Sequence, residues 1–282
     1  AQYNLGWMHE RGLGVPKDYG KTVEWYGKAA EQGDAYAQFG LGLLYMNGQG
    51  VPKDSGKAVQ WYEKAVAQGN AAAQCNLGVL YRDGQGVARD YGKAFDLFSK
   101  AAEQGNAAAQ NNLGMAYYLG QGVPRDFKKA FDLYNKAAEQ GDVGALVNLG
   151  KMYADGYGVP KDYGKAVEWY TKAAEQGNAA AQGNLGAMYY EGRGVPKDYK
   201  KAFDLLTKAM KQGNLGAQNN LGLIYYTGQG VPRDYKKAFD LISKAAEQGH
   251  AYAQTCLGWI YQNGTGGVSK NPGKAVEWYT KA

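Results

Sequence analysis

The 282-residue sequence contains only two cysteines and two histidines. Cys75 and Cys256 lie far apart along the chain, so they predict no disulfide framework. Together with His9 and His250 they form no spacing typical of a metal site, and we expect neither a metal nor a cofactor. No apolar run approaches the ~18 residues of a membrane-spanning helix, so no transmembrane segment is predicted.

The sequence also lacks a charged segment followed by an apolar stretch, so no signal peptide is visible. Because the chain begins without Met and inside a repeat, we expect it to be a piece of a longer protein. The compartment stays open, since two unpaired cysteines suit a reducing cytoplasm as well as a bacterial envelope protein. A periplasmic or secreted location is slightly favoured over a cytoplasmic one.

Charge of one sign never gathers in one segment, although the net charge is +6. Lysine alternates with aspartate and glutamate along the whole length. This pattern is typical of a solvated mixed surface and predicts no nucleic-acid partner.

Glycine, in contrast, is abundant, with 42 residues, and it is periodic. A glycine followed by valine returns every 36 residues, at Gly14, Gly50, Gly86, Gly122, Gly158, Gly194 and Gly230, and after one extra residue at Gly267. A fixed period of this length indicates a repeat protein.

The segment GVPKDYGKT ends in Gly-Lys-Thr, as a nucleotide-binding P-loop does. A P-loop has four residues between its two glycines, whereas five separate Gly14 from Gly20. Pro16 also lacks an N–H group that the phosphate cradle would need. Nearly the same string returns in other repeats, so we interpret it as a structural element and predict no ATP site.

One copy, residues 178–213, shows how the repeat is built. Asn178 can cap a first helix (helix A), which Gly192 ends, and Asp198 can cap a second helix (helix B), which Gly213 closes. Apolar residues follow at helical spacing in both segments. Such a helix pair cannot bury its apolar faces alone, but stacked pairs form a continuous core.

We therefore predict an all-α fold, a right-handed α-solenoid of about eight 36-residue helix-A/helix-B repeats that form a single domain over 1–282. The expected repeats are 1–33, 34–69, 70–105, 106–141, 142–177, 178–213, 214–249 and 250–282. A glycine also recurs inside each helix A, as at Gly114, at a cost of about 1 kcal/mol relative to alanine. Its recurrence predicts a close helix contact that a side chain would block.

The recurring pattern is A-x-A-Q-x-x-L-G-x-x-Y-x-x-G-x-G-V-x-x-D-x-x-K-A, then Trp-Tyr or Leu-Tyr, and later K-A-A-E-Q-G. One copy carries it at Ala37, Gln38, Leu41, Gly42, Tyr45, Gly48, Gly50, Asp54, Lys57, Ala58, Trp61, Tyr62, Lys64 and Ala65. The pattern resembles the Sel1-like repeat, a relative of the tetratricopeptide repeat. It departs where His9 replaces the helix-A tyrosine and where Thr22 replaces the helix-B alanine.

The resemblance implies a bacterial protein that serves as a non-enzymatic scaffold or adaptor and binds a protein or peptide partner in the concave helix-A groove. In a cysteine-rich bacterial branch of this family, a disulfide joins the two helices of each pair, and some members of that branch are named β-lactamases. This chain lacks the paired cysteines of that branch. A β-lactamase-like hydrolase and a structural spacer without a specific ligand are the alternatives.

No catalytic motif is present, so we predict no enzyme activity. No serine is followed three residues later by lysine, as a β-lactamase nucleophile would be. The two histidines lie nearly seven repeats apart, and His250 takes a position that Asp or Asn holds in other repeats, which predicts a helix cap. Carboxylates recur at fixed positions, as solvated residues do.

Positions that vary between copies on the outward arc of helix A are free to recognise a partner. We number them from the cap. The ninth and twelfth positions are rich in apolar and aromatic residues, which is typical of a protein-binding surface. By resemblance, helices A line the concave side of the solenoid. The predicted groove residues are Met115, Tyr118, Tyr190, Leu223, Tyr226 and Trp259. The alternative is that part of this arc packs on the next repeat.

The sixth position holds asparagine in six copies, among them Asn76, Asn112, Asn148, Asn184 and Asn220. A side-chain amide can pair with both the N–H and the C=O of an extended peptide, so this ladder could clamp a peptide in the groove. The structural alternative, which the sequence supports equally, is that each asparagine bonds only to the helix of the adjacent repeat and ties the stack together. The chain also starts inside a helix A and stops inside a helix B, which predicts end-to-end self-association.

Overall fold

The computed structural model describes all 282 residues and contains sixteen α-helices and no strands. The chain forms two compact units, residues 1–142 and 143–282. The first unit contains α1 (Gln2–Arg11), α2 (Tyr19–Glu31), α3 (Ala35–Asn47), α4 (Ser55–Ala67), α5 (Ala71–Asp83), α6 (Tyr91–Glu103), α7 (Ala107–Leu119) and α8 (Phe127–Glu139). The second contains α9 (Val143–Asp155), α10 (Tyr163–Glu175), α11 (Ala179–Glu191), α12 (Tyr199–Lys211), α13 (Leu215–Thr227), α14 (Tyr235–Glu247), α15 (Ala251–Asn263) and α16 (Pro272–Lys281).

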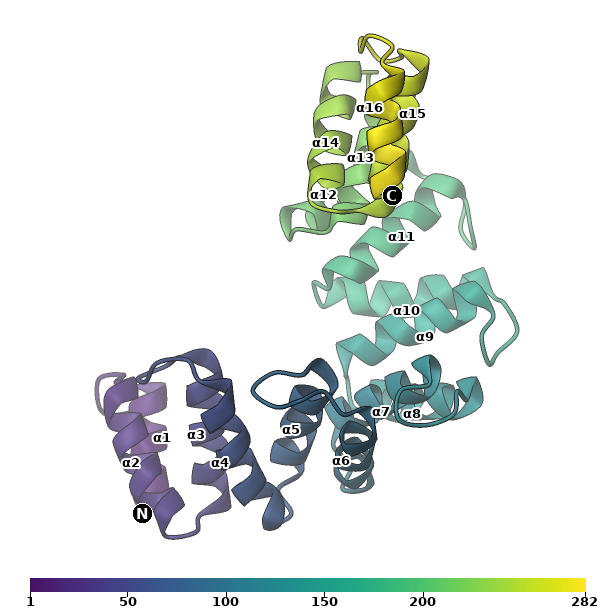
Figure 1. The fold of residues 1–282 in the computed structure, drawn as a ribbon. Coiled ribbons are helices and arrows are strands. Elements are labelled where there is room, and N and C mark those ends of the chain that lie inside the picture. The colour runs from purple at the N-terminus through teal and green to yellow at the C-terminus, as the bar shows by residue number, and fades with distance from the viewer. The chain divides into compact units, whose positions relative to one another are not determined.

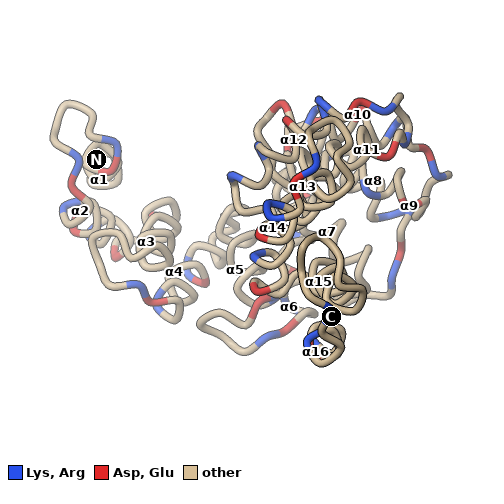
Figure 2. Tube along the Cα trace, turned by 90° about the horizontal axis from the view of Figure 1, so that it is seen from above, with Lys and Arg blue, Asp and Glu red and all other residues tan.

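Odd-numbered helices are the predicted helices A, and even-numbered helices are the predicted helices B. Within each unit the two helices of a repeat pack against each other, and each pair packs on the next (Figure 1). The predicted all-α solenoid of stacked helix pairs is confirmed. Basic and acidic residues are interspersed along the trace (Figure 2).

The helix boundaries follow from local capping chemistry. Asn106 Oδ1 accepts a hydrogen bond from the backbone N–H of Ala109 at 2.8 Å, at the start of α7, and Gly120 ends this helix in the left-handed conformation. Asp126 caps α8 in the same way. His250 Nδ1 accepts from the N–H of Ala253 at 3.2 Å, which confirms the predicted capping role of this histidine.

The glycine inside each helix A allows the two helices of a repeat to approach closely. A Cβ atom on Gly114 would lie 2.8 Å from Cε1 of Tyr134, whose ring packs across α7 from α8. The same position of helix B holds Tyr26, Tyr62, Phe98, Tyr134, Tyr170, Leu206, Ile242 and Tyr279. The predicted close contact is confirmed, and its partner is this large helix-B side chain.

The lysine of the Gly-Lys string lies over an aromatic ring of its own repeat. Lys201 Nζ is 4.4 Å from the centroid of the Tyr189 ring and donates to its hydroxyl at 2.8 Å. The same cation–π contact recurs in seven consecutive repeats, from Lys57 over Tyr45 to Lys274 over Tyr261. This contact accounts for the recurring lysine without a phosphate.

A second loop glycine joins neighbouring repeats. Gly122 has φ +74°, and a Cβ atom there would run into the backbone of Tyr91 at the start of α6, including its carbonyl carbon at 2.7 Å. Gly120 has nearly the same φ of +73°, but its nearest neighbour would be Cβ of Arg125 at 3.6 Å. Only the second glycine therefore combines a left-handed conformation with close approach to the preceding repeat.

A buried glutamine ties three segments together in many repeats. Gln110 Oε1 accepts from Nε2 of Gln140 at 2.8 Å, at the end of α8, and Gln110 Nε2 donates to the carbonyl of Ala102 in the preceding repeat at 3.4 Å. The equivalent glutamine pair recurs at Gln38, Gln74 and Gln182. This network satisfies amide groups that would otherwise be costly to bury.

Tyrosine hydroxyls are buried within the helix pairs of the first unit. Burial raises the pKa of Tyr62 to about 12, and the long hydrogen bond from Asn76 Nδ2, at 3.4 Å, opposes this shift. Burial also raises the pKa values of Tyr26 and Tyr134. Phe98, which is 1% exposed, takes the place of Tyr62 in the next helix B, so a ring without a hydroxyl fits this position.

The protein should lose stability as the pH rises from 10 toward 12. A tyrosine in the unfolded chain loses its proton near pH 10, whereas burial raises the pKa of the same tyrosine in the folded protein. The contribution of the protonated tyrosine to stability is therefore fully present below pH 10, and it is lost as the pH rises through the folded pKa. Titration of one such tyrosine should lower the free energy of unfolding by about 1.4 kcal/mol per pH unit over that range. Tyr62→Phe should reduce the slope and leave stability at pH 7 nearly unchanged, measured by urea unfolding at each pH. An unchanged slope would show that Tyr62 does not titrate with unfolding.

The outermost repeats expose side chains that are buried elsewhere. Leu5 is 40% exposed, whereas the equivalent Leu41 is 2% exposed, and Val276 is 64% exposed where Val59 is 7% exposed. End-to-end self-association and the single domain over 1–282 stay predictions. None of the helices has the length and apolar character needed to cross a membrane.

Candidate functional site

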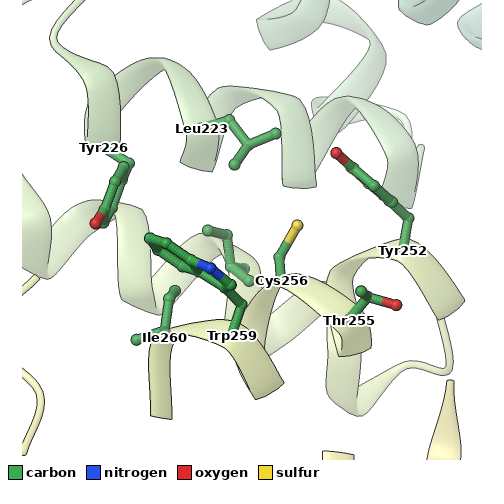
Figure 3. A pocket seen from close by; sticks show the side chains of 8 residues that line it. Leu223, Tyr226, Tyr252, Thr255, Cys256, Trp259 and Ile260 are labelled. Carbon is green, nitrogen blue, oxygen red and sulfur yellow. The ribbon is translucent and has the colours of Figure 1, made fainter. Parts of the chain in front are cut away.

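An apolar pocket of about 360 Å³ opens between two helices A of the second unit, α13 and α15. Its walls are Leu223, Tyr226, Ile242, Tyr252, Thr255, Cys256, Trp259 and Ile260. Figure 3 shows Leu223 on α13 facing Cys256 and Trp259 on α15, with Tyr226 and Tyr252 at opposite ends. No charged side chain lines this pocket.

Aromatic contacts fix the shape of one end of the pocket. The Tyr226 and Trp259 rings meet edge-on, with centroids 6.0 Å apart, and Tyr226 also meets the Tyr235 ring of helix B at 5.3 Å. Trp259 is nevertheless 46% exposed. At the other end Tyr252 is 58% exposed. The Trp259 ring is thus held in place while much of its surface meets solvent, and Tyr252 offers a second exposed ring, which is typical of residues that anchor a partner.

A smaller hollow of about 160 Å³ adjoins the pocket and is more polar. Leu223 and Tyr252 line both hollows. The smaller one is completed by Ala187, Tyr190, Glu191 and Asn220, so it spans α11, α13 and α15. The Tyr190 hydroxyl lies 3.2 Å from Thr227 Oγ1, which bridges two neighbouring repeats.

The charges around the two hollows come mainly from one carboxylate. Glu191 Oε2 lies 2.6 Å from Arg193 Nε, but both side chains are substantially exposed, at 41% and 55%, so this ion pair contributes little. The pKa of Tyr252 is raised mainly by the negative charge that Cys256 carries when its thiol is ionised. Burial and the Glu191 carboxylate raise it further.

The Cys256 thiol is not activated for nucleophilic chemistry. Burial raises its pKa, and a hydrogen bond with Tyr252 only partly opposes this effect. A reactive cysteine needs a lowered pKa, because the thiolate is the nucleophile. Furthermore, no group of three histidine, cysteine, aspartate or glutamate side chains is placed to hold a metal ion. The arrangement suits binding through apolar and aromatic surface.

The structure brings five of the eleven predicted site residues together. Tyr190, Asn220, Leu223, Tyr226 and Trp259 line the two hollows. Asn184 is exposed on α11 without lining either hollow, and Asn148 is half-buried on α9. Asn76, Asn112, Met115 and Tyr118 are half-buried in the first unit, where the Tyr118 ring meets Phe127 edge-on at 5.3 Å. A groove that runs along all helices A stays a prediction.

The asparagines of the ladder have different partners. Asn112 accepts from Arg82 Nη1 at 2.8 Å and donates to the carbonyl of Ala108 at 2.9 Å, and Asn76 donates to Tyr62 in the preceding repeat. The bonds to Arg82 and Tyr62 join neighbouring repeats, as the structural alternative describes, whereas the bond to Ala108 lies within α7. Asn220 accepts from Asn219 Nδ2 at 3.4 Å and also lines the smaller hollow. The peptide-clamping role of the ladder stays a prediction.

Tyr252 and Glu191 were not predicted from the sequence. Tyr252 stands at the second position of its helix A, where five of the other helices have alanine or glycine, at Ala72, Ala108, Gly144, Ala180 and Gly216. A large ring at a position of small residues was therefore a usable signal. Glu191 is the thirteenth residue of its helix A, a position that Asp155 also fills with a carboxylate, and it stands out only through its neighbours in space.

Comparison with known proteins identifies the repeat. Eight segments match the model of the Sel1 repeat, at residues 1–34, 35–70, 71–106, 107–142, 143–178, 179–214, 216–250 and 251–282. No curated protein gives a match.

Several solved bacterial structures are similar over most of the chain. A protective antigen of uropathogenic Escherichia coli with an SLR fold is 42% identical over 99% of this chain, with a TM-score of 0.74, and this chain spans 60% of its length. A Sel1 repeat protein from Oxalobacter formigenes is 30% identical, with 99% and 96% of the two chains covered and a TM-score of 0.70. The immunity protein PA5088 from Pseudomonas aeruginosa is 25% identical, with 75% and 82% covered and a TM-score of 0.54.

Proposed function

Because this chain belongs to the Sel1 repeat family, whose solenoids are generally non-enzymatic scaffolds, we propose that it binds another protein on the helices A of its second unit. The observation that carries this proposal is the apolar pocket between α13 and α15, with the rings of Trp259 and Tyr252 partly exposed at its edge. The partner would cover these rings and fill the pocket.

The variation along the second unit supports a specific binding surface there. The ninth position of helix A is Lys151 in α9 and Ala187 in α11, but Leu223 in α13 and Trp259 in α15. A spacer that met only water would need no large apolar residues at these outward positions. Aromatic residues in apolar pockets commonly contribute most of the free energy of a protein interface.

Trp259→Ala should weaken partner binding by about 30-fold or more, because truncation of a central aromatic anchor costs about 2 kcal/mol or more. The partner is first recovered with the wild-type chain from an extract of the organism that encodes it. Its affinity is then measured with purified protein by calorimetric titration.

The matched control is Trp169→Ala, which removes the same residue type from a helix B of the same unit, where Lys172 Nζ lies 4.3 Å from the ring centroid. This variant should bind as the wild type does. Equal binding by both variants would contradict the proposed site, and failure to recover any partner would favour the spacer alternative. Melting temperatures of both variants show whether the unit stays folded.

A further inference from the structure

The two adjoining hollows differ in chemistry, and we propose that together they recognise a partner segment with a large apolar side chain and an arginine within two residues of each other. This inference rests on the proposed function and specifies its ligand. The larger pocket would take the apolar side chain, and the smaller hollow would take the guanidinium group.

The larger pocket suits an aromatic or long aliphatic side chain. Its volume of about 360 Å³ lies at the lower end of the range of about 300–1,000 Å³ typical of ligand pockets. Its walls offer Leu223, Ile260 and the Trp259 ring, without any charged group to desolvate. Burial of an apolar side chain in this pocket would therefore be favourable, and it would leave no charged group without a partner.

The smaller hollow has the features that a guanidinium group requires. Its one charged wall residue is the carboxylate of Glu191, and the aromatic residues Tyr190 and Tyr252 stand beside it. A guanidinium group can donate to the carboxylate in a fork and stack on a tyrosine ring, whereas an ammonium group lacks this planar geometry. Arginine is therefore preferred over lysine.

The present partner of Glu191 does not block this role. Arg193 is two residues away in the chain, and the exposed pair that it forms with Glu191 is weak because water competes with it. An incoming guanidinium group would share the Glu191 carboxylate with Arg193 or replace Arg193 as its partner. It would gain the ring contacts in addition, since Tyr190 and Tyr252 are already in the wall of the hollow.

The common wall sets the spacing of the two side chains. Leu223 and Tyr252 line both hollows, so the apolar and basic groups must enter side by side. In an extended peptide, side chains two residues apart point to the same face about 7 Å from each other. Asn220 also lines the smaller hollow, where its amide can pair with the peptide backbone.

The test begins with selection of a phage-displayed library of random 12-residue peptides on the whole chain. We expect enriched peptides to contain a large apolar residue and an arginine within two positions. For one synthetic peptide of this set, Arg→Gln should weaken binding to the wild type about tenfold, as loss of a charge-assisted contact and ring stacking implies. Against Glu191→Gln, the same peptide change should alter affinity only about threefold, because the contacts with the tyrosine rings remain.

The control variant is Asp155→Asn, which removes the carboxylate at the equivalent position of α9 and changes the net charge by the same amount. It should leave the tenfold effect of the peptide arginine intact. If Asp155→Asn reduces that effect as much as Glu191→Gln does, the preference is a general charge effect and the inference is wrong. Selection of acidic peptides, or of none, would also overturn it.

The two proposals can fail separately. Peptides that depend on Trp259 but show no coupling between their arginine and Glu191 would overturn the basic subsite and leave the binding surface standing. Peptides that carry the predicted pair but bind Trp259→Ala as tightly as the wild type would place the ligand elsewhere and contradict both proposals.

Discussion

Gly122→Ala should destabilise the first unit by about 2–5 kcal/mol, the largest effect we expect from a single methyl group. Two costs combine at this position. A side chain at φ +74° is strained, and the added Cβ would meet the backbone of Tyr91, which belongs to the preceding repeat and cannot rotate away. Urea unfolding followed by circular dichroism measures the loss.

Gly120→Ala separates the two costs. Its φ of +73° gives the same strain, but the nearest atom to the new methyl group would be Arg125 Cβ at 3.6 Å, an ordinary contact. This variant should therefore lose only about 1–2 kcal/mol. If the two variants are equally stable, close approach between the loop and the preceding repeat contributes nothing measurable.

Gly114→Leu should destabilise the same unit by about 1–3 kcal/mol, since it overpacks a tight helix contact. The first atom of the new side chain would lie 2.8 Å from the Tyr134 ring and 3.3 Å from the carbonyl oxygen of Ala130. The ring is 2% exposed and surrounded, so it has little room to move. Thermal and urea unfolding both report this change.

Gly27→Leu should change stability in the opposite direction from Gly114→Leu. Gly27 also lies inside a helix, α2, but an added Cβ would meet nothing within 4 Å. Leucine has the higher helix propensity, so this variant should gain up to about 1 kcal/mol. If Gly114→Leu melts at or above the wild-type temperature, the glycine in helix A is not required for close packing.

The fold was predictable because its determinants are local and repeated. Caps such as Asn178 and Asp198 act on N–H groups three residues away, and both were read correctly from one copy. The 36-residue period and the resemblance to the Sel1 repeat then extended that reading to the whole chain, and both are confirmed. The Gln110–Gln140 bond was not foreseen, since it joins side chains 30 residues apart.

The site was predictable only in part, because it depends on which residues meet between repeats. Leu223, Tyr226 and Trp259 were found from their outward positions, whereas Tyr252 belongs to the pocket through its place beside them in space. The asparagine ladder shows the same limit. Asn76 and Asn112 occupy one position of the repeat, yet their partners differ because the preceding repeats present Tyr62 and Arg82 respectively.

The stacking of helix pairs also determines how each unit responds to mechanical force. The extensive helix contacts within a unit join helices of one repeat or of adjacent repeats, so a pull on its ends is transmitted through the interfaces in series. One interface can then yield while those beyond it stay intact. Release of a 36-residue repeat frees about 120 Å of extended chain. Release of a terminal repeat of either unit would therefore lengthen the chain by this amount, while the helix contacts among the remaining repeats of that unit stay in place.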